Sequence, residues 1–230
     1  MAGLAKAGAT WARIDRAPLP APDGLQELGR DARACAEDAR VAWVAVQPEA
    51  SAVAERGPAR VGAVTPALSQ VLARADAAAA EPIYLFAACT AAWARTQGFT
   101  PLIDERDELR LMLLRVAQLA PDLDEAGAER ELGKLFAALP AYAGGDLPQA
   151  RSHFEAALAR APDAARTRIA FARSVAVKAQ DRSLFQAQLQ AASNLPDASG
   201  AAEARDLLAR ENELFGPAEA AQPIPGGPTH

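Results

Sequence analysis

Histidine and cysteine are scarce in this chain, which limits the catalytic chemistry available to it. His153 and His230 are the only histidines among 230 residues, and Cys35 and Cys89 are the only cysteines. The sequence contains no HExxH or CxxC zinc motif and no glycine-rich loop of the phosphate-binding type. Ser152 directly precedes His153 and so points to a different helix face, unlike the members of a catalytic triad. The sequence predicts a protein that is not an enzyme and that holds no metal and no cofactor.

An acidic segment is the one further candidate for a metal site. Asp104, Glu105, Asp107 and Glu108 lie within five residues of one another. At the start of a helix, acidic side chains are favoured by the positive end of the helix dipole. We therefore expect Asp104 to cap a helix and this segment to stabilise its first turn rather than to bind a cation.

Five side chains with aromatic or polar tips are candidates for contacting a ligand or a partner: Tyr84, Trp93, Arg95, Tyr142 and His153. Packing in the core is the simpler expectation for Trp93, because helical bundles use tryptophan as a filler. A structural hydrogen bond to a neighbouring hairpin or turn is the simpler expectation for His153. Tyr142 falls in a long turn and is expected to be the most exposed of the five.

The two cysteines leave two states open. Cys35 and Cys89 could form a disulfide in an oxidising compartment. Two buried free thiols are the preferred reading, because unpaired cysteine is among the most buried residue types.

The segment from Asp124 to Pro162 predicts two antiparallel helices. Apolar residues recur at helical spacing before Pro140, and the glycines of the following turn end this first helix. Asp146 then stands as an N-cap, with Gln149 three residues later as its capping-box partner. Pro162 marks the end of the second helix.

The same segment carries most of a tetratricopeptide signature. The first helix supplies the Leu-Gly-x-x-aromatic element and the second supplies Ala-x-x-x-aromatic-x-x-Ala with a closing proline: Leu132, Gly133, Phe136, Ala150, Phe154, Ala157 and Pro162. The turn between them is about five residues longer than the usual ~34-residue unit allows. Small residues let the helix backbones approach, and the aromatic side chains fill the space between hairpins.

Outside this hairpin the pattern is also helical. The fold predicted is all-α, with about nine helices in antiparallel hairpins of tetratricopeptide-like type. Residues 1–23 are expected to form an extended arm because of three prolines, residues 24–215 a single helical-repeat domain, and residues 216–230 a disordered tail rich in proline and glycine. A central helix is expected to begin near Pro82.

Composition fits this picture. Half of the residues are apolar but only 5% are aromatic, and the net charge is −5 with both signs interspersed. No basic stripe suits a nucleic-acid backbone. No uninterrupted run of 18 apolar residues could span a membrane, and the start of the chain lacks the apolar core of a signal peptide.

Two strings of the sequence resemble the T-component (TatT) family of tripartite ATP-independent periplasmic (TRAP) transporters. The first, ALPAYAGGDLPQARSHFEAAL, holds the Gly-Gly-Asp-Leu turn and the Ala-Arg-x-His-Phe-x-x-Ala-Leu helix of that family. The second holds Gln180, Asp181 and Arg182, with Phe185 and Leu189 downstream. The resemblance covers roughly residues 81–195. It is more specific than the tetratricopeptide match, because His153 and the Gln-Asp-Arg string are not part of that consensus.

The resemblance implies a periplasmic adaptor that docks a solute-binding subunit and helps to deliver a small hydrophobic or anionic ligand. Members of the family are usually anchored by a lipid on an N-terminal cysteine, which this sequence lacks. A leader absent from this chain would accompany a periplasmic location. Two alternatives stay open: a cytoplasmic tetratricopeptide-type scaffold or assembly factor, and a helical enzyme or cofactor-binding bundle. Homo-oligomers are compatible with each.

Overall fold

The computed structural model describes residues 2–16, 24–54 and 66–216, and every regular element in these ranges is a helix. The all-α prediction with about nine helices is therefore confirmed. The principal helices are α1 (Ala2–Arg16), α2 (Leu25–Val46), α4 (Pro66–Arg74), α5 (Ala77–Gln97), α6 (Phe99–Leu119), α7 (Gly127–Ala138), α8 (Leu147–Arg160), α9 (Ala165–Phe171), α11 (Arg182–Ser193) and α12 (Ala198–Ala209). Shorter elements are η2 (Pro48–Ala50), α3 (Ser51–Ala54), η3 (Ala141–Ala143), η4 (Ala172–Ala176), α10 (Val177–Ala179) and α13 (Glu211–Phe215).

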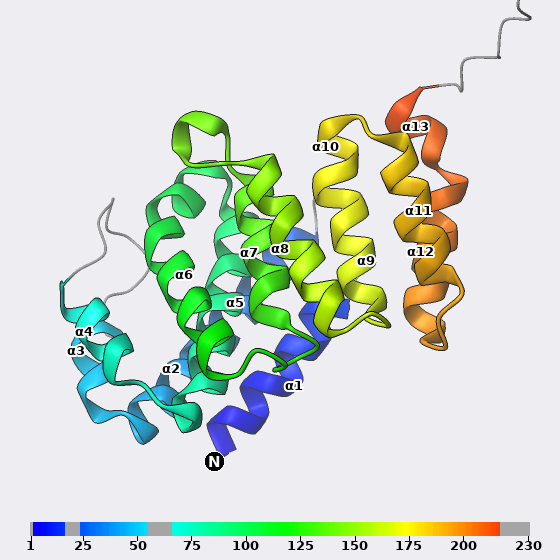
Figure 1. The fold of residues 1–230 in the computed structure, drawn as a ribbon. Coiled ribbons are helices and arrows are strands. Elements are labelled where there is room, and N and C mark those ends of the chain that lie inside the picture. Colours follow the sequence, from blue (N-terminus) through cyan, green and yellow to red (C-terminus); the bar gives the residue numbers. More distant parts are fainter. Residues whose placement is uncertain (1, 17–23, 55–65, 217–230) are drawn as a thin grey trace, which may run out of the picture.

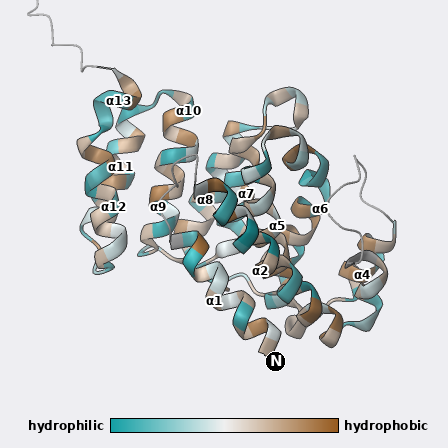
Figure 2. Ribbon diagram, turned by 180° about the vertical axis from the view of Figure 1, so that it is seen from behind, coloured by the Kyte–Doolittle hydropathy of each residue, from teal (hydrophilic) through white to brown (hydrophobic). Residues whose placement is uncertain are grey.

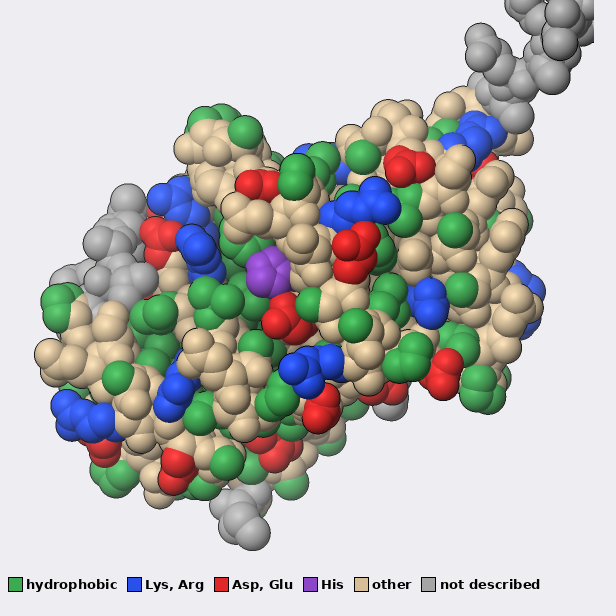
Figure 3. All heavy atoms as spheres, viewed as in Figure 1, with side chains coloured by type: hydrophobic (Ala, Val, Ile, Leu, Met, Phe, Trp, Pro, Cys, Tyr) green, Lys and Arg blue, Asp and Glu red, His purple; other side chains and the backbone are tan. Residues whose placement is uncertain are grey.

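The helices stack side by side as a curved array, with α6 near one end and α12 near the other (Figure 1). Helices that follow one another in the sequence, such as α5 and α6, α7 and α8, or α11 and α12, pack together in antiparallel pairs. Helix α1 runs obliquely to this array, as Figures 1 and 2 show from opposite sides. Basic and acidic side chains are interspersed over the face drawn in Figure 3, with no stripe of one sign.

The expected extended arm at the N-terminus is wrong for the described part of it. Residues Ala2–Arg16 form the helix α1, which packs mainly against α2. All three prolines of the region follow Arg16, so the preceding alanine-rich stretch is free to be helical. Ala7 and Trp11 lie on the buried face of this helix. Residues 17–23 of the expected arm and residues 217–230 of the expected tail lie outside the described residues.

The central helix is α5, and it begins earlier than expected. The side chain of Asp76 accepts hydrogen bonds from the backbone amides of Ala78 and Ala79, so Asp76 caps the helix and Pro82 lies inside it. The preceding helix, α4, ends at Arg74. By length and composition α5 could cross a membrane, but most of this stretch is buried by the surrounding helices, as in a core helix.

Helix α6 also begins earlier than predicted. Gly98, at a φ of 103°, separates α5 from α6, and Pro101 falls in the first turn of α6, where proline is tolerated. Asp104 is consequently inside the helix and not its cap. The acidic segment lies beyond the first turn of α6, so the prediction that it stabilises that turn is wrong.

The predicted hairpin of α7 and α8 is confirmed. Asp146 accepts hydrogen bonds at 2.9 Å from the backbone amide of Gln149 and at 2.8 Å from its side chain. Phe154 is fully buried, and a Cβ atom built on Gly133 would lie 2.8 Å from its ring. The two backbones therefore approach as closely as the Gly133–Phe154 pair of the signature requires.

A disulfide joins Cys35 of α2 to Cys89 of α5, with 5.8 Å between the two Cα atoms. The preferred expectation of two free thiols is thus wrong, although both sulfurs are buried as expected. No sequence spacing could show this pairing, because 54 residues separate the cysteines. The bridge lies in the larger hydrophobic cluster, and a smaller cluster joins α9 and η4 to α11 and α12.

Candidate functional site

A pocket of about 620 Å³ opens between the helices where α1 approaches the array. Its walls come from α1, α2, α5, α7, α12 and the continuous helical stretch of α9, η4 and α10. Five basic side chains line it, together with three acidic ones: Arg95, Lys134, Arg166, Arg173 and Lys178, then Asp15, Asp197 and Glu203. The remaining lining is largely apolar and includes Leu25, Leu28, Ala137, Ala138, Ile169, Ala170 and Val177.

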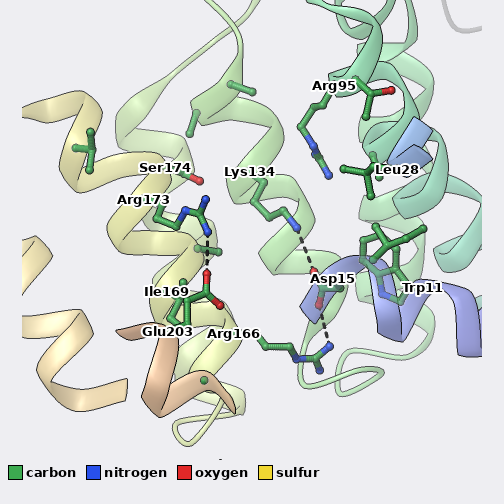
Figure 4. Close-up of a pocket in the computed structure, with 18 of the residues that line it drawn as sticks. Trp11, Asp15, Leu28, Arg95, Lys134, Arg166, Ile169, Arg173, Ser174 and Glu203 are labelled. Carbon is green, nitrogen blue, oxygen red and sulfur yellow. Dashed lines mark hydrogen bonds and ion pairs between the residues drawn. The ribbon is translucent and has the colours of Figure 1, made fainter. Parts of the chain in front are cut away.

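Asp15 is the central acidic group of the pocket, and three cations surround it, two of which, Lys134 and Arg166, are seen beside it in Figure 4. Its carboxylate lies 2.8 Å from Nη1 of Arg166, 3.3 Å from Nζ of Lys134 and 3.3 Å from Nη2 of Arg130. Only 4% of the Asp15 side chain is exposed. Burial would raise the pKa of this carboxyl, but Lys134, Arg130 and Arg166 together hold it well below its ordinary value.

Asp124 forms the second acidic centre, just behind Asp15. Its carboxylate accepts hydrogen bonds from Arg130 at 2.7 Å, from Arg166 at 2.9 Å and from the hydroxyl of Tyr84 at 2.5 Å. Trp11 donates to the same group at 3.3 Å, so both centres hold α1 in place. Burial raises the pKa of the Tyr84 hydroxyl well above its ordinary value, so Tyr84 is a donor here and not an acid.

A left-handed turn places Asp124. Asp124, Glu125 and Ala126 have φ values of 51°, 56° and 57°, and none is glycine. Each such residue costs about 1–2 kcal/mol relative to the right-handed region, and strain of this kind persists where surrounding contacts hold it. The hydrogen bonds of Asp124, together with the one at 2.9 Å from Arg166 to Glu125, supply those contacts.

The other end of the pocket has basic groups with fewer acidic partners. Arg95 points into the space beside Lys134 (Figure 4), and its Nη1 atom is buried without a hydrogen-bond partner. Its Nη2 atom lies 3.6 Å from the buried carboxylate of Glu131, which Lys134 also contacts at 2.5 Å. Lys178 donates to the backbone oxygen of Ala137 at 2.6 Å rather than to an acid.

A π-helix and an ion pair shape the wall of the pocket that faces α7. The element η4 is a π-helix, a rare form that is frequent at functional sites. It carries Arg173 and Ser174, which line the pocket, and Arg173 pairs with Glu203 of α12 at 2.8 Å. The Arg173–Glu203 ion pair therefore connects this wall of the pocket to α12.

The five candidate residues do not form one site. Arg95 lines the pocket, and Tyr84 is buried in the charged cluster behind it. Trp93 is half-buried against the hydrophobic core. Tyr142 is 86% exposed in η3, as its place in the long turn predicted. The His153 ring stacks on Phe136 and its Nδ1 atom lies 2.6 Å from Glu129, so its hydrogen bond is made within its own hairpin.

Sequence reasoning missed the residues at the centre of the site, Asp15, Asp124, Arg130, Lys134 and Arg166. One local signal was available: Arg130, Glu131 and Lys134 interrupt the apolar pattern of a helix otherwise built for burial. The partner that Arg130 and Lys134 share, Asp15, lies more than 100 residues away on α1. Among the described residues, no group of three or more His, Cys, Asp or Glu side chains is placed to hold a metal ion.

This geometry defines an all-helical array with a charged pocket between its helices, an architecture suited to binding. The chain belongs to the TRAP transporter T-component family (TAtT), whose model matches residues 36–215. The resemblance drawn from the two sequence strings is therefore confirmed, and the chain is a component of a TRAP transporter. Comparison with curated proteins gives no match.

Proposed function

We propose that this chain is a non-catalytic adaptor that works on the periplasmic side of a TRAP transporter, where it docks the solute-binding subunit and holds a small ligand. The pocket is the observation that carries this proposal. Its volume of about 620 Å³ lies within the range of ~300–1,000 Å³ usual for small-molecule sites. It combines an apolar lining with a few charged groups, as such sites do.

The disulfide supports the periplasmic side. Bridges such as Cys35–Cys89 form and persist in oxidising compartments and are rare in the cytoplasm. A cytoplasmic scaffold would keep both thiols reduced. Thiol titration of protein taken from its native cell, trapped with acid before lysis, separates the two locations: no reactive thiol in the unfolded sample supports the periplasm, and two reactive thiols contradict it.

Ligand binding is tested by filling the pocket. Ala170 lines it, so Ala170→Phe places a ring in the cavity, whereas Ala159→Phe adds the same ring on the exposed face of α8. Native mass spectrometry of protein purified from its own host measures any retained small molecule. We expect a bound mass on the wild type and on Ala159→Phe, and none on Ala170→Phe. An equal bound mass on both variants places the ligand elsewhere and contradicts the proposal.

Docking is tested separately with purified components. The solute-binding subunit of the same TRAP transporter is mixed with this chain and analysed by light scattering after size-exclusion chromatography. A mass equal to the sum of one copy of each supports the adaptor role. Elution of the two proteins at their separate masses, with and without the transported solute, contradicts it.

A further inference from the structure

The contact between α1 and the pocket has the chemistry of a bound ligand. Asp15 brings a carboxylate into a position formed by Arg130, Lys134 and Arg166. Two of those cations, Lys134 and Arg166, line the pocket, and so does Asp15 itself. The three cations therefore form a carboxylate site that a side chain of the same chain fills.

The grip of α1 on the array depends on few bulky groups. Much of the helix is alanine and glycine, and Trp11 is its one large side chain that is fully buried. Trp11 donates one hydrogen bond, to Asp124 at 3.3 Å, and Asp15 supplies the ion pairs. The outer face adds exposed pairs such as Arg13 with Asp31 at 2.9 Å, and exposed pairs contribute little to stability.

We propose that α1 is a displaceable wall of the pocket, and that a small carboxylate ligand takes the place of Asp15 on Lys134 and Arg166 and releases the Asp15 end of α1. This inference rests on the proposed ligand-binding function of the same pocket. The apolar part of the ligand lies along Ala137, Ala138 and Ala170, which line the adjoining wall.

The exchange conserves charge in the buried site. Removal of Asp15 alone leaves Lys134 and Arg166 short of the carboxylate that they share, and unpaired charges in a buried site are strongly unfavourable. Arrival of another carboxylate restores the balance. Release of α1 is therefore coupled to binding of the anion, because the ligand and Asp15 compete for the same cations.

Asp15→Asn tests the competition, because it keeps the shape of the side chain and removes its charge. Asp31→Asn is the matched control, since it removes an ion pair of α1 outside the pocket. Hexanoate is the probe, hexanamide the uncharged counterpart, and chloride the control for ionic strength. Calorimetry should show hexanoate binding about tenfold more tightly to Asp15→Asn than to the wild type and Asp31→Asn, a ratio typical of coupled sites. Equal affinity for all three overturns the proposal.

Hydrogen exchange tests the movement in the wild-type protein. Saturating hexanoate should speed exchange of the α1 amides, whereas hexanamide should leave it unchanged. Hexanoate that binds while α1 exchange stays constant or slows overturns the proposal. Trp11→Phe supplies a second test if Asp15→Asn does not fold. It removes the hydrogen bond to Asp124 but no charge, so it should also bind hexanoate more tightly than the wild type.

Failure of this inference is distinguishable from failure of the proposed function. If no variant binds hexanoate but Ala170→Phe still abolishes a ligand retained by the wild type, the displaceable wall is overturned and the pocket remains a ligand site. If hexanoate does not bind and no ligand is retained by the wild type, the displaceable wall and the ligand-binding part of the proposed function are both overturned.

Discussion

Nη2 of Arg130 lies 2.7 Å from Oδ2 of Asp124, and Arg130 is a fully buried residue. The same guanidinium group reaches Asp15 of α1 and the hydroxyl of Tyr84 on α5, so a single buried cation connects α7 to two segments that are distant in the sequence. The free energy of unfolding should depend strongly on this one residue.

Arg130→Met should lower the free energy of unfolding by about 3–5 kcal/mol, because it removes one of the two cations that the Asp15 and Asp124 carboxylates share and leaves only Arg166 between them. Urea denaturation monitored by circular dichroism measures this. Arg151→Met is the control: Arg151 pairs with Glu155 on the exposed face of α8, and its loss should cost less than about 1 kcal/mol. Similar losses for the two variants would show that the cluster contributes no more than a surface pair.

The Cys35–Cys89 disulfide should stabilise the fold by about 2–4 kcal/mol, since it closes a long loop in the unfolded chain. Reductant should therefore lower the urea midpoint of the wild type. The double variant Cys35→Ala/Cys89→Ala should unfold at a lower midpoint that reductant does not change. A wild-type midpoint that is the same with and without reductant would contradict this stabilisation.

Gly133→Ala should destabilise the protein by about 1–3 kcal/mol, because the added Cβ meets the Phe154 ring at 2.8 Å and overpacks the α7–α8 hairpin. Gly8→Ala is the control within α1, where an added Cβ meets nothing within 4 Å and should stabilise the helix by up to about 1 kcal/mol. Thermal unfolding of both variants gives the comparison. A stabilising effect of Gly133→Ala would show that the two helices separate readily.

Glu105 should make stability fall as the pH rises from about 4.5 to 7. Burial, with Glu108 and Asp104 nearby, raises the pKa of Glu105 to about 7 in the folded protein. Between the unfolded and folded pKa values the folded chain binds the additional proton, so deprotonation disfavours folding above this window. Because Glu105 is partly solvated, we expect its ionisation to lower the free energy of unfolding by only about 1 kcal/mol.

Glu105→Gln should therefore raise the melting temperature at pH 8 but not at pH 4. The exposed Glu81→Gln is the matched control and should change the melting temperature equally little at both values. If Glu105→Gln stabilises the protein by the same amount at pH 4 and pH 8, the effect does not come from ionisation.

The features that could be predicted from the sequence depend on residues close together in the chain. The Asp146 cap needs only Gln149, and the burial of Phe154 follows from helical spacing. The exposed position of Tyr142 follows in the same way from the length of its turn. Local hydrogen bonds and periodicity decide each of these features.

The centre of the candidate site could not be predicted, for the opposite reason. Asp15 meets Arg166 across 151 positions of sequence, and Cys35 meets Cys89 across 54. In both pairs, the sequence around one residue gives no indication of which residue it contacts. The early start of α6 was missed because Asp104 is a residue type that often caps helices, although Pro101 before it is compatible with the first turn of a helix.

The π-helix η4 has one consequence for how relatives of this chain are compared. Its turn holds one residue more than an α-helical turn, so the segments before and after it are out of phase. Loss of one residue there would rotate Val177 and Lys178 by about 100° relative to α9. Lys178 would then no longer face the carbonyl oxygens of Ala137 and Leu139. A one-residue alignment gap within Ala172–Ala176 would therefore mark a relative with a differently built pocket wall.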